Sequence, residues 1–251
     1  MRDDLGSGYA GTPTRVVSLV PSLTEAVAYT APELLVGATD WCTHPPGLDV
    51  ARVGGTKYPD LDKVLAARPD LVLANAEENR REDVDALRQR GIAVWVTYPR
   101  SVDQALTSLD ALRGALGADR PAWLDEAATA WAAPVPEPRR TAVIPVWRRP
   151  WIVLGGDTFA SDVLRRLGVD NLYADAGERY PRPSLDELQD RRPELVVLPD
   201  EPYAFAADDG PEVFEVPCAL VSGRHLTWYG PSLREARTVL ERQLAAAFRR
   251  P

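Results

Sequence analysis

One sequence pattern occurs twice in this chain, about half a chain apart. The first copy, residues 61–74, is LDKVLAARPDLVLA, and the second, residues 185–198, is LDELQDRRPELVVL. Positions 61, 62, 68, 69, 71 and 72 recur unchanged as positions 185, 186, 192, 193, 195 and 196. Each copy predicts a short amphipathic helix, a turn at the proline and an apolar strand. A unit that is repeated only once indicates two similar lobes, because a solenoid needs three or more copies.

The Arg-Pro pairs at 68–69 and 192–193 predict where the two short helices end. A residue before proline is pushed out of the α region toward extended backbone, so Arg68 and Arg192 should terminate their helices. The runs that follow, such as Leu71-Val72-Leu73, are too apolar to alternate. Such runs are typical of strands covered on both faces, as in parallel sheets.

Strand and helix patterns alternate along the rest of the chain, which predicts an α/β fold with mainly parallel sheets. Ser22 with Glu25, and Ser232 with Glu235, have the spacing of capping boxes, so we expect a helix to begin at each serine. The expected strands are 15–20, 34–38, 71–74, 92–97, 141–146, 152–154, 195–198 and a run within 213–221, and the other expected helices are 80–89, 101–116, 121–133 and 159–167.

The helix at 121–133 stands between the two half-chains and is followed by prolines at 134, 136 and 138, which favour a stiff linker. We therefore expect four regions. They are a flexible N-terminus (1–14), an N-terminal lobe (15–117), a connector helix with a Pro-rich linker (118–138) and a C-terminal lobe (139–251).

Charge and hydropathy exclude two classes of partner. The formal net charge of −8 disfavours a nucleic acid held by phosphate contacts. No apolar stretch reaches the roughly 18 residues of a membrane span. The polar start MRDDLGSG lacks a signal pattern, which favours a cytoplasmic protein, the alternative being an extracytoplasmic one whose signal has been removed. Cys42 and Cys218 are expected to be free thiols.

Several segments together resemble the helical-backbone class of ABC-transporter substrate-binding proteins, and the cobalamin-binding branch most. They are SLVPSLTE at 18–25, the 37–46 segment with its Pro-Pro pair, VGG at 53–55, RPDLV at 68–72, Gly91-Ile92, GVDNL at 168–172 and RPELV at 192–196. The resemblance covers nearly the whole chain from Arg15. It implies two similar Rossmann-like lobes, bridged by a single connector helix, with the ligand in a cleft between them.

The resemblance implies a binding protein, not an enzyme, that holds a cobalamin, another corrinoid or a different metal chelate and requires no cofactor. An Fe-siderophore, haem or free divalent-metal receptor is the alternative within the binding class. A cytosolic enzyme, ligand carrier or sensor on the same scaffold is the alternative outside it. An ABC permease is the implied partner, docked through a surface acid on each lobe, for which Asp170 is the second-lobe candidate.

Candidate ligand-binding residues follow the predicted strands, because ligands of α/β sheets lie beyond the carboxyl ends of the strands. Aromatic side chains there give rigid contact area for a bulky planar ligand, although some aromatic rings simply pack under loops. By resemblance, Tyr58 and Trp228 lie near cobalamin-contacting aromatic positions. The candidates are Pro21, Ser22, Trp41, Thr56, Lys57, Tyr58, Tyr98, Trp147, Asp157, Thr158, Tyr180, Trp228 and Tyr229.

Histidine occurs twice, as His44 and His225, once in each half of the chain. The two side chains are candidate metal ligands or an axial ligand to a chelated metal, and two ordinary hydrogen-bonding histidines are the alternative. No close ligand pair such as CxxC or HxxxH supports a dedicated metal site. The GxSxG elbow is also absent, so no catalytic residues are predicted.

Overall fold

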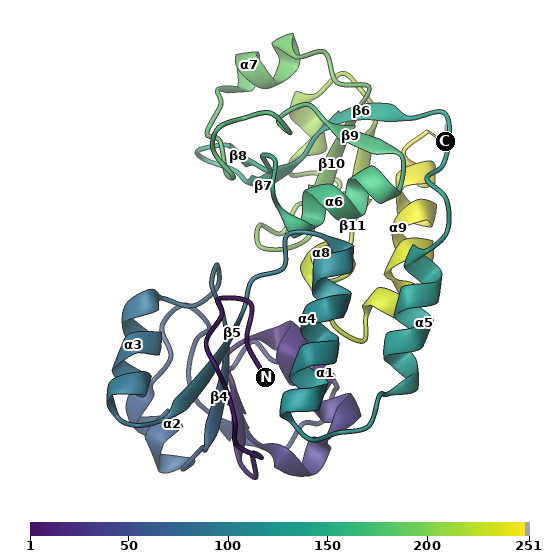
Figure 1. Cartoon of the computed structure of the whole chain (residues 1–251). Helices are drawn as coiled ribbons and strands as arrows, with labels where there is room; N and C mark the ends of the chain where they lie inside the picture. Colours follow the sequence, from purple (N-terminus) through teal and green to yellow (C-terminus); the bar gives the residue numbers. More distant parts are fainter. Residues whose placement is uncertain (249–251) are drawn as a thin grey trace. The chain divides into compact units, whose positions relative to one another are not determined.

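The computed structural model describes residues 1–248, which form two compact units (Figure 1). Unit 1 consists of Met1–Pro99, Asp103–Glu126 and Tyr229–Pro231. Unit 2 consists of Arg100–Val102, Ala127–Trp228 and the chain from Ser232 onward. The chain therefore passes between the units more than once, and the predicted connector helix, α5 (Ala122–Trp131), is shared between them.

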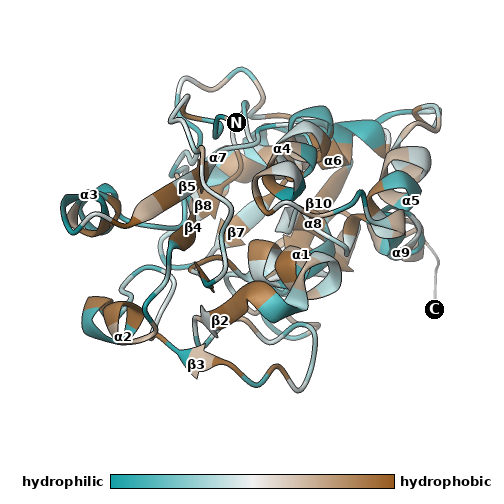
Figure 2. Cartoon of the chain, turned by 60° about the horizontal axis from the view of Figure 1, so that its bottom comes forward, coloured by the Kyte–Doolittle hydropathy of each residue, from teal (hydrophilic) through white to brown (hydrophobic). Residues whose placement is uncertain are grey.

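Unit 1 is built on a parallel five-stranded sheet in the order β3-β2-β1-β4-β5. Helices α2 and α3 lie on one side of the sheet and α1 and α4 on the other (Figures 1 and 2). Its elements are β1 (Val16–Ser18), α1 (Pro21–Thr30), the 3-10 turn η1 (Pro32–Leu34), β2 (Leu35–Ala38), β3 (Ala51–Arg52), α2 (Leu61–Ala66), β4 (Leu71–Asn75), α3 (Arg81–Gln89), β5 (Ala93–Thr97) and α4 (Val102–Ala115).

Unit 2 repeats the central part of this topology in a parallel four-stranded sheet of order β11-β10-β6-β9. A two-stranded antiparallel ribbon, β7-β8, is added to it. The elements are β6 (Arg140–Val143), β7 (Pro145–Trp147), β8 (Ile152–Val153), α6 (Phe159–Arg166), β9 (Val169–Asn171), α7 (Leu185–Asp190), β10 (Leu195–Pro199), the 3-10 turn η2 (Pro211–Val213), β11 (Cys218–Val221), α8 (Gly223–Thr227) and α9 (Leu233–Ala246).

The order β2-β1-β4-β5 of unit 1 corresponds to β9-β6-β10-β11 of unit 2. In each sheet the first strand of the unit, β1 or β6, is central, with the next strand on one side and the strand of the repeated motif on the other. The α/β class with two similar, mainly parallel units is therefore confirmed. The repeat detected in the sequence is helix α2 with strand β4 in unit 1 and helix α7 with strand β10 in unit 2.

The short helices end two residues before the predicted arginines, and the backbone at those arginines also differs from the expectation. Helix α2 ends at Ala66 and α7 at Asp190. Arg68 and Arg192 both have φ of 50°, which is the left-handed region and not the extended backbone expected before proline. The proline excludes the right-handed α region in both copies, and the chain takes the same left-handed turn.

Neither predicted capping box forms. Helix α1 begins at Pro21 with Val20 as its N-cap, because proline at the first helical position has its φ already set and needs no N–H partner. Ser22 therefore lies inside the first turn. Ser232 has helical backbone angles and makes no side-chain cap hydrogen bond to α9. The short helix α8 precedes α9, and the Ser222 side chain caps it.

The core of each unit lies between its sheet and the covering helices. In unit 1 it includes Val17, Leu19, Val72 and Leu87, all fully buried. Figure 2 shows strands β4 and β5 largely brown, whereas α3 carries both brown and teal parts. This amphipathic pattern is the reason why α3 packs with one face on the sheet.

Residues 1–14, expected to be a flexible end, make specific hydrogen bonds to the edge strand β5. The Asp3 carboxylate accepts from the amide of Val96 at 3.0 Å, and the Asp4 amide donates to the Val96 carbonyl at 3.2 Å. No helix within residues 1–248 is both long enough and apolar enough to cross a membrane.

Candidate functional site

The carboxyl ends of the parallel strands form one loop-bearing edge in each unit. In unit 1 the strand order reverses between β1 and β4, and in unit 2 between β6 and β10. Ligands of open α/β sheets bind at such switch points, outside the strand ends. The predicted site residues are distributed over these two edges, and the edges are described separately.

Two aromatic rings at the edge of unit 1 are largely exposed. Trp41 follows β2 and Tyr58 follows β3, and each is 69% exposed. The Arg80 guanidinium lies over the Tyr58 ring at 4.7 Å, a cation–π contact that the sequence did not indicate. Lys57 donates to the Glu77 carbonyl at 3.3 Å. The edge therefore presents two exposed aromatic rings, and the guanidinium over one of them is itself paired with Asp83 at 2.8 Å.

Arg52 fixes the loop that carries Trp41 through three hydrogen bonds to backbone carbonyls. Its guanidinium donates to the carbonyls of Thr39 at 2.9 Å, Cys42 at 3.0 Å and Leu48 at 3.1 Å. The buried Cys42 thiol accepts a hydrogen bond from Thr24 at 3.0 Å. Burial raises the pKa of this thiol, and Cys42 and Cys218 are both free, as predicted. Cys42 therefore serves as packing beneath the loop.

The other predicted residues of this edge are less accessible than Trp41 and Tyr58. Ser22, in the first turn of α1, is 2% exposed, and its hydroxyl has no hydrogen-bond partner within the described part of the chain. Thr56 and Tyr98 are half-buried, as is Pro21 at the start of α1. The Tyr98 amide donates to Asp4 at 2.7 Å.

Tyr229 belongs to unit 1 and is buried, so its position does not match a ligand-contacting ring. Its hydroxyl accepts from the Asn75 side-chain amide at 2.6 Å and lies 2.8 Å from the Thr97 hydroxyl. Burial raises the pKa of the Tyr229 phenol far above its ordinary value. Tyr229 therefore anchors the segment 229–231 to the ends of β4 and β5.

At the edge of unit 2, the exposed predicted rings are Trp147, at 41%, and Tyr180, at 43%. Asp157 is exposed and forms an ion pair with Arg100 at 2.9 Å. Thr158 is buried because its hydroxyl caps α6, accepting from the Ser161 amide at 3.3 Å. Of these four, Thr158 is thus engaged in structure and the other three remain accessible.

Trp228 is half-buried at the end of α8, with Arg224 5.6 Å from its ring centre. Burial, then the neighbouring Asp200, raises the pKa of Glu201, whereas a hydrogen bond with Trp228 lowers it. Glu201 is therefore a neighbour of Trp228 that sequence reasoning missed. Its only sequence signal was a position in the loop after β10.

The histidines lie in different units and have protein partners. His225 Nδ1 is 2.8 Å from the Ser222 hydroxyl, and its Nε2 is 3.3 Å from a Glu235 oxygen. His44 Nδ1 is 3.1 Å from the Thr43 hydroxyl. Within residues 1–248 no three His, Cys, Asp or Glu side chains are grouped to hold a metal ion.

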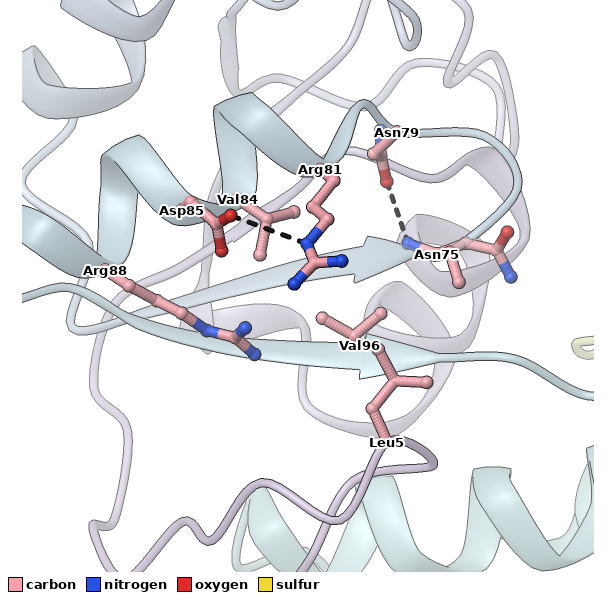
Figure 3. Close-up of a pocket in the computed structure, with 9 residues that line it drawn as sticks. Leu5, Asn75, Asn79, Arg81, Val84, Asp85, Arg88 and Val96 are labelled. Carbon is pink, nitrogen blue, oxygen red and sulfur yellow. Dashed lines mark hydrogen bonds and ion pairs between the residues drawn. The ribbon is translucent and has the colours of Figure 1, made fainter.

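A cavity of about 330 Å³ lies in unit 1 between α3, β5 and Leu5. Figure 3 shows Val84 and Val96 among the side chains that line it. The polar side chains around it are already engaged: Arg81 approaches Asp85 at 3.6 Å, and Arg88 donates to the Val94 carbonyl at 3.2 Å. The cavity therefore indicates no particular ligand chemistry.

Comparison with known families gives a match over most of the chain. A family model described as periplasmic binding protein matches residues 16–212. The chain belongs to this family. A vitamin B12-binding protein of Yersinia pestis (strain Pestoides F) is 28% identical over 196 residues, which are 73% of this chain and 69% of the relative. Members of the family are binding proteins, in agreement with the predicted class.

Solved structures share the fold. The periplasmic vitamin B12-binding protein BtuF of Vibrio cholerae has a TM-score of 0.78 at 20% identity, covering 95% of this chain and 99% of that one. The periplasmic haem-binding protein RhuT of Roseiflexus sp. RS-1, in its apo form, has a TM-score of 0.72 at 19% identity, covering 93% and 98%. The family match confirms the predicted resemblance to substrate-binding proteins, and these structures confirm the fold.

Proposed function

We propose that this protein binds, and releases unchanged, a bulky planar ligand of the corrinoid or metal-chelate class. The observation that carries the proposal is the exposure of large aromatic rings at the strand ends. Trp41 and Tyr58 in unit 1 and Trp147 and Tyr180 in unit 2 are each more than 40% exposed. Exposed aromatic rings that gather where α/β sheets bind their ligands provide rigid apolar contact for a flat molecule.

Cobalamin is the first ligand to test, because vitamin B12-binding proteins are among both the sequence relatives and the structural neighbours. Haem is the second, because a haem-binding protein shares the fold. The metal in either ligand arrives inside its own macrocycle, which agrees with a chain that groups no three metal-ligating side chains in its described residues.

We further propose that the protein delivers its ligand to an ABC permease and works outside the cytoplasm, the second of the two locations considered from the sequence. Membership of the periplasmic binding protein family supports both points. Asp170, the predicted docking acid, forms an ion pair with Arg139, and a hydrogen bond from Arg139 lowers the pKa of Asp170. We therefore expect docking through other acids in preference to Asp170.

Isothermal titration with cyanocobalamin, haem, a ferric siderophore and zinc tests the ligand class. We expect binding to one of the macrocyclic or chelate ligands, weakened about tenfold by Tyr58→Ala and by Trp228→Ala, since a buried aromatic contact contributes at least about 1.4 kcal/mol. Tyr29→Ala is the matched control: Tyr29 is 46% exposed but lies in α1 near its carboxyl end. Equal losses in all three variants, or binding of zinc alone, contradict the proposal.

A further inference from the structure

Five aromatic side chains form a continuous cluster in unit 2, from its core to its surface. Phe205, 5% exposed, belongs to the hydrophobic core, and Trp151 stacks on it with ring centres 6.2 Å apart. Tyr203 lies 4.6 Å from Phe205 and packs edge-on against Trp147 at 5.6 Å. Phe214 completes the cluster beside Trp151 at 5.7 Å. The Trp147 ring is the exposed end of this aromatic platform.

Two rings of the aromatic platform come from segments that follow the switch-point strands of the unit 2 sheet. Trp147 ends β7, which follows β6 in the chain and belongs to the β7-β8 ribbon, and Tyr203 lies in the loop after β10. Ligands of such sheets bind at the switch point. From the sequence, Tyr203 is recognisable only as an aromatic residue in a loop of the second lobe, 199–210, which is acidic and irregular.

Arg148 ties the loop that carries Tyr203 to the ribbon that carries Trp147. Its guanidinium pairs with both Asp209 and Glu212, and the side chain is only 9% exposed. The same guanidinium lies over the Trp151 ring at 5.3 Å. Arg148 therefore joins carboxylates of the acidic loop to the base of the aromatic platform, and a forked guanidinium suits two carboxylates at once.

Asp209 connects Arg148 to Tyr203. One Asp209 carboxylate oxygen pairs with Arg148, and the other accepts a hydrogen bond from the Tyr203 hydroxyl at 2.5 Å. Gly210 is needed for the turn: its φ is 124°, and a Cβ there would lie 2.6 Å from the Phe205 ring. Glu212 accepts from the Gly210 amide at 2.5 Å. Every link from Arg148 to the Tyr203 ring is thus a direct contact.

We propose that Arg148 is a positioning residue for ligand binding. It holds Asp209 and Glu212 so that Tyr203 supports Trp147 edge-on and fixes the exposed ring that meets the ligand. The inference rests on the proposed function for the identity of the ligand, although the arrangement of the rings stands without it. Arg148 itself, nearly buried and paired with two carboxylates, does not bind a ligand acid.

A double-mutant cycle between Arg148→Met and Trp147→Ala tests the proposal, with the ligand found by titration, cyanocobalamin first. We expect Arg148→Met to weaken binding about two- to tenfold, the range for loss of an aromatic packing contact. The same change should have no effect in the Trp147→Ala background. Arg148→Lys should retain part of the affinity, because an ammonium can pair with one carboxylate. Additive losses overturn the proposal.

Tyr203→Phe keeps the ring and removes only the hydroxyl bond to Asp209, so it covers the case in which Arg148→Met fails to fold. We expect a smaller loss of affinity, which again disappears in Trp147→Ala. An undiminished affinity, or a loss that persists in Trp147→Ala, contradicts the positioning role.

A measurement without ligand separates the two proposals. In protein labelled with 5-fluorotryptophan, the Trp147 resonance is assigned by its loss in Trp147→Phe. We expect Arg148→Met to shift or broaden this resonance. An unchanged resonance overturns the positioning role even if cobalamin binds. A changed resonance in a protein that binds none of the tested ligands supports the positioning role and contradicts the proposed function.

Discussion

The two copies of the repeat can be compared residue by residue. Asp60 caps α2 and Ser184 caps α7, each helix is six residues long, and both copies then turn through a left-handed arginine. The acid after the proline, Asp70 or Glu194, binds the start of the neighbouring central strand in its own unit. The two copies therefore share the length of the helix, the position of its cap and the left-handed backbone at the arginine.

The copies differ in how firmly that acid is bound. Asp70 accepts three hydrogen bonds, from the amide and hydroxyl of Thr14 and the amide of Arg15. Glu194 accepts two, both from Thr141. Arg15 also reaches back to the Ala67 carbonyl at 2.7 Å, which the shorter side chain of its counterpart Thr141 cannot do. The first copy therefore makes more hydrogen bonds to the neighbouring strand segment than the second copy does.

The copies differ most where their strands end. β4 ends at Asn75, which accepts from the amides of Glu77 and Glu78 and donates to Tyr229. β10 ends at Pro199 and leads into the acidic loop of the aromatic platform. The repeated part therefore builds the scaffold, and the unrepeated loops after it supply the surfaces proposed to bind ligand.

Truncating the first leucine of each repeated strand, β4 and β10, gives the largest expected effect on the free energy of unfolding. Leu71 and Leu195 are 0% and 1% exposed. We expect Leu71→Ala and Leu195→Ala each to lower the free energy of unfolding by about 2–5 kcal/mol, the usual range for a buried leucine. Urea unfolding measures both, and a loss below about 1 kcal/mol in one copy alone contradicts the equivalence of the two strands.

Substitutions at the left-handed arginines give an intermediate effect. We expect Arg68→Val and Arg192→Val each to cost about 1–3 kcal/mol, because a β-branched residue is strained at a φ of 50°. Arg68→Gly and Arg192→Gly should be neutral or stabilising by up to about 1 kcal/mol. Thermal unfolding of the four variants checks the sign. A glycine variant that is as unstable as the valine variant shows that the arginine side chain, and not its backbone angle, matters.

Asp70 and Glu194 give the smallest expected effect on the free energy of unfolding. That effect is visible as a dependence of stability on pH. Burial acts to raise the pKa of Asp70, but hydrogen bonds from Thr14 and Arg15 lower it below its ordinary 3.8. Hydrogen bonds from Thr141 likewise lower the pKa of Glu194 below 4.5. Each acid therefore contributes stability that is complete above its unfolded-state pKa and is lost as the pH falls through its lower native pKa.

Replacing either acid removes part of this acid-induced loss of stability. Between pH 5 and pH 2 we expect the stability of Asp70→Asn, measured by urea titration, to fall less steeply than that of the wild type. Glu194→Gln should change the slope in the same direction by a smaller amount, because Glu194 accepts fewer hydrogen bonds. A larger change for Glu194→Gln reverses the ranking of the two copies.

The repeat, the α/β class and most elements could be predicted from the sequence, because period and proline positions are local signals. The capping boxes predicted at Ser22 and Ser232 were wrong, since Pro21 begins α1 and the Ser232 side chain makes no cap hydrogen bond, although α9 does begin directly after Ser232 as predicted. At the strand ends, the loops that carry Trp41, Tyr58 and Trp147 were predictable. The contacts of Arg80, Tyr203 and Arg148 were not, because they join residues from separate loops. Tyr229 had the same local signal as Trp228, and only tertiary burial distinguishes them.

The anchoring of Tyr229 has a consequence for the ancestry and engineering of this chain. A duplicated motif invites the view that each half is a cassette that recombination could exchange near residue 126. Unit 1, however, includes Tyr229–Pro231, and a Cβ at Gly230 would lie 2.8 Å from the Ser22 carbonyl. A crossover at the midpoint would thus separate Tyr229–Pro231 from the unit 1 residues that it contacts. The chimera would instead carry a 229–231 segment that fits the unit 1 of a different protein. Chimeras of this family should inherit 229–231 together with Ser22, Asn75 and Thr97.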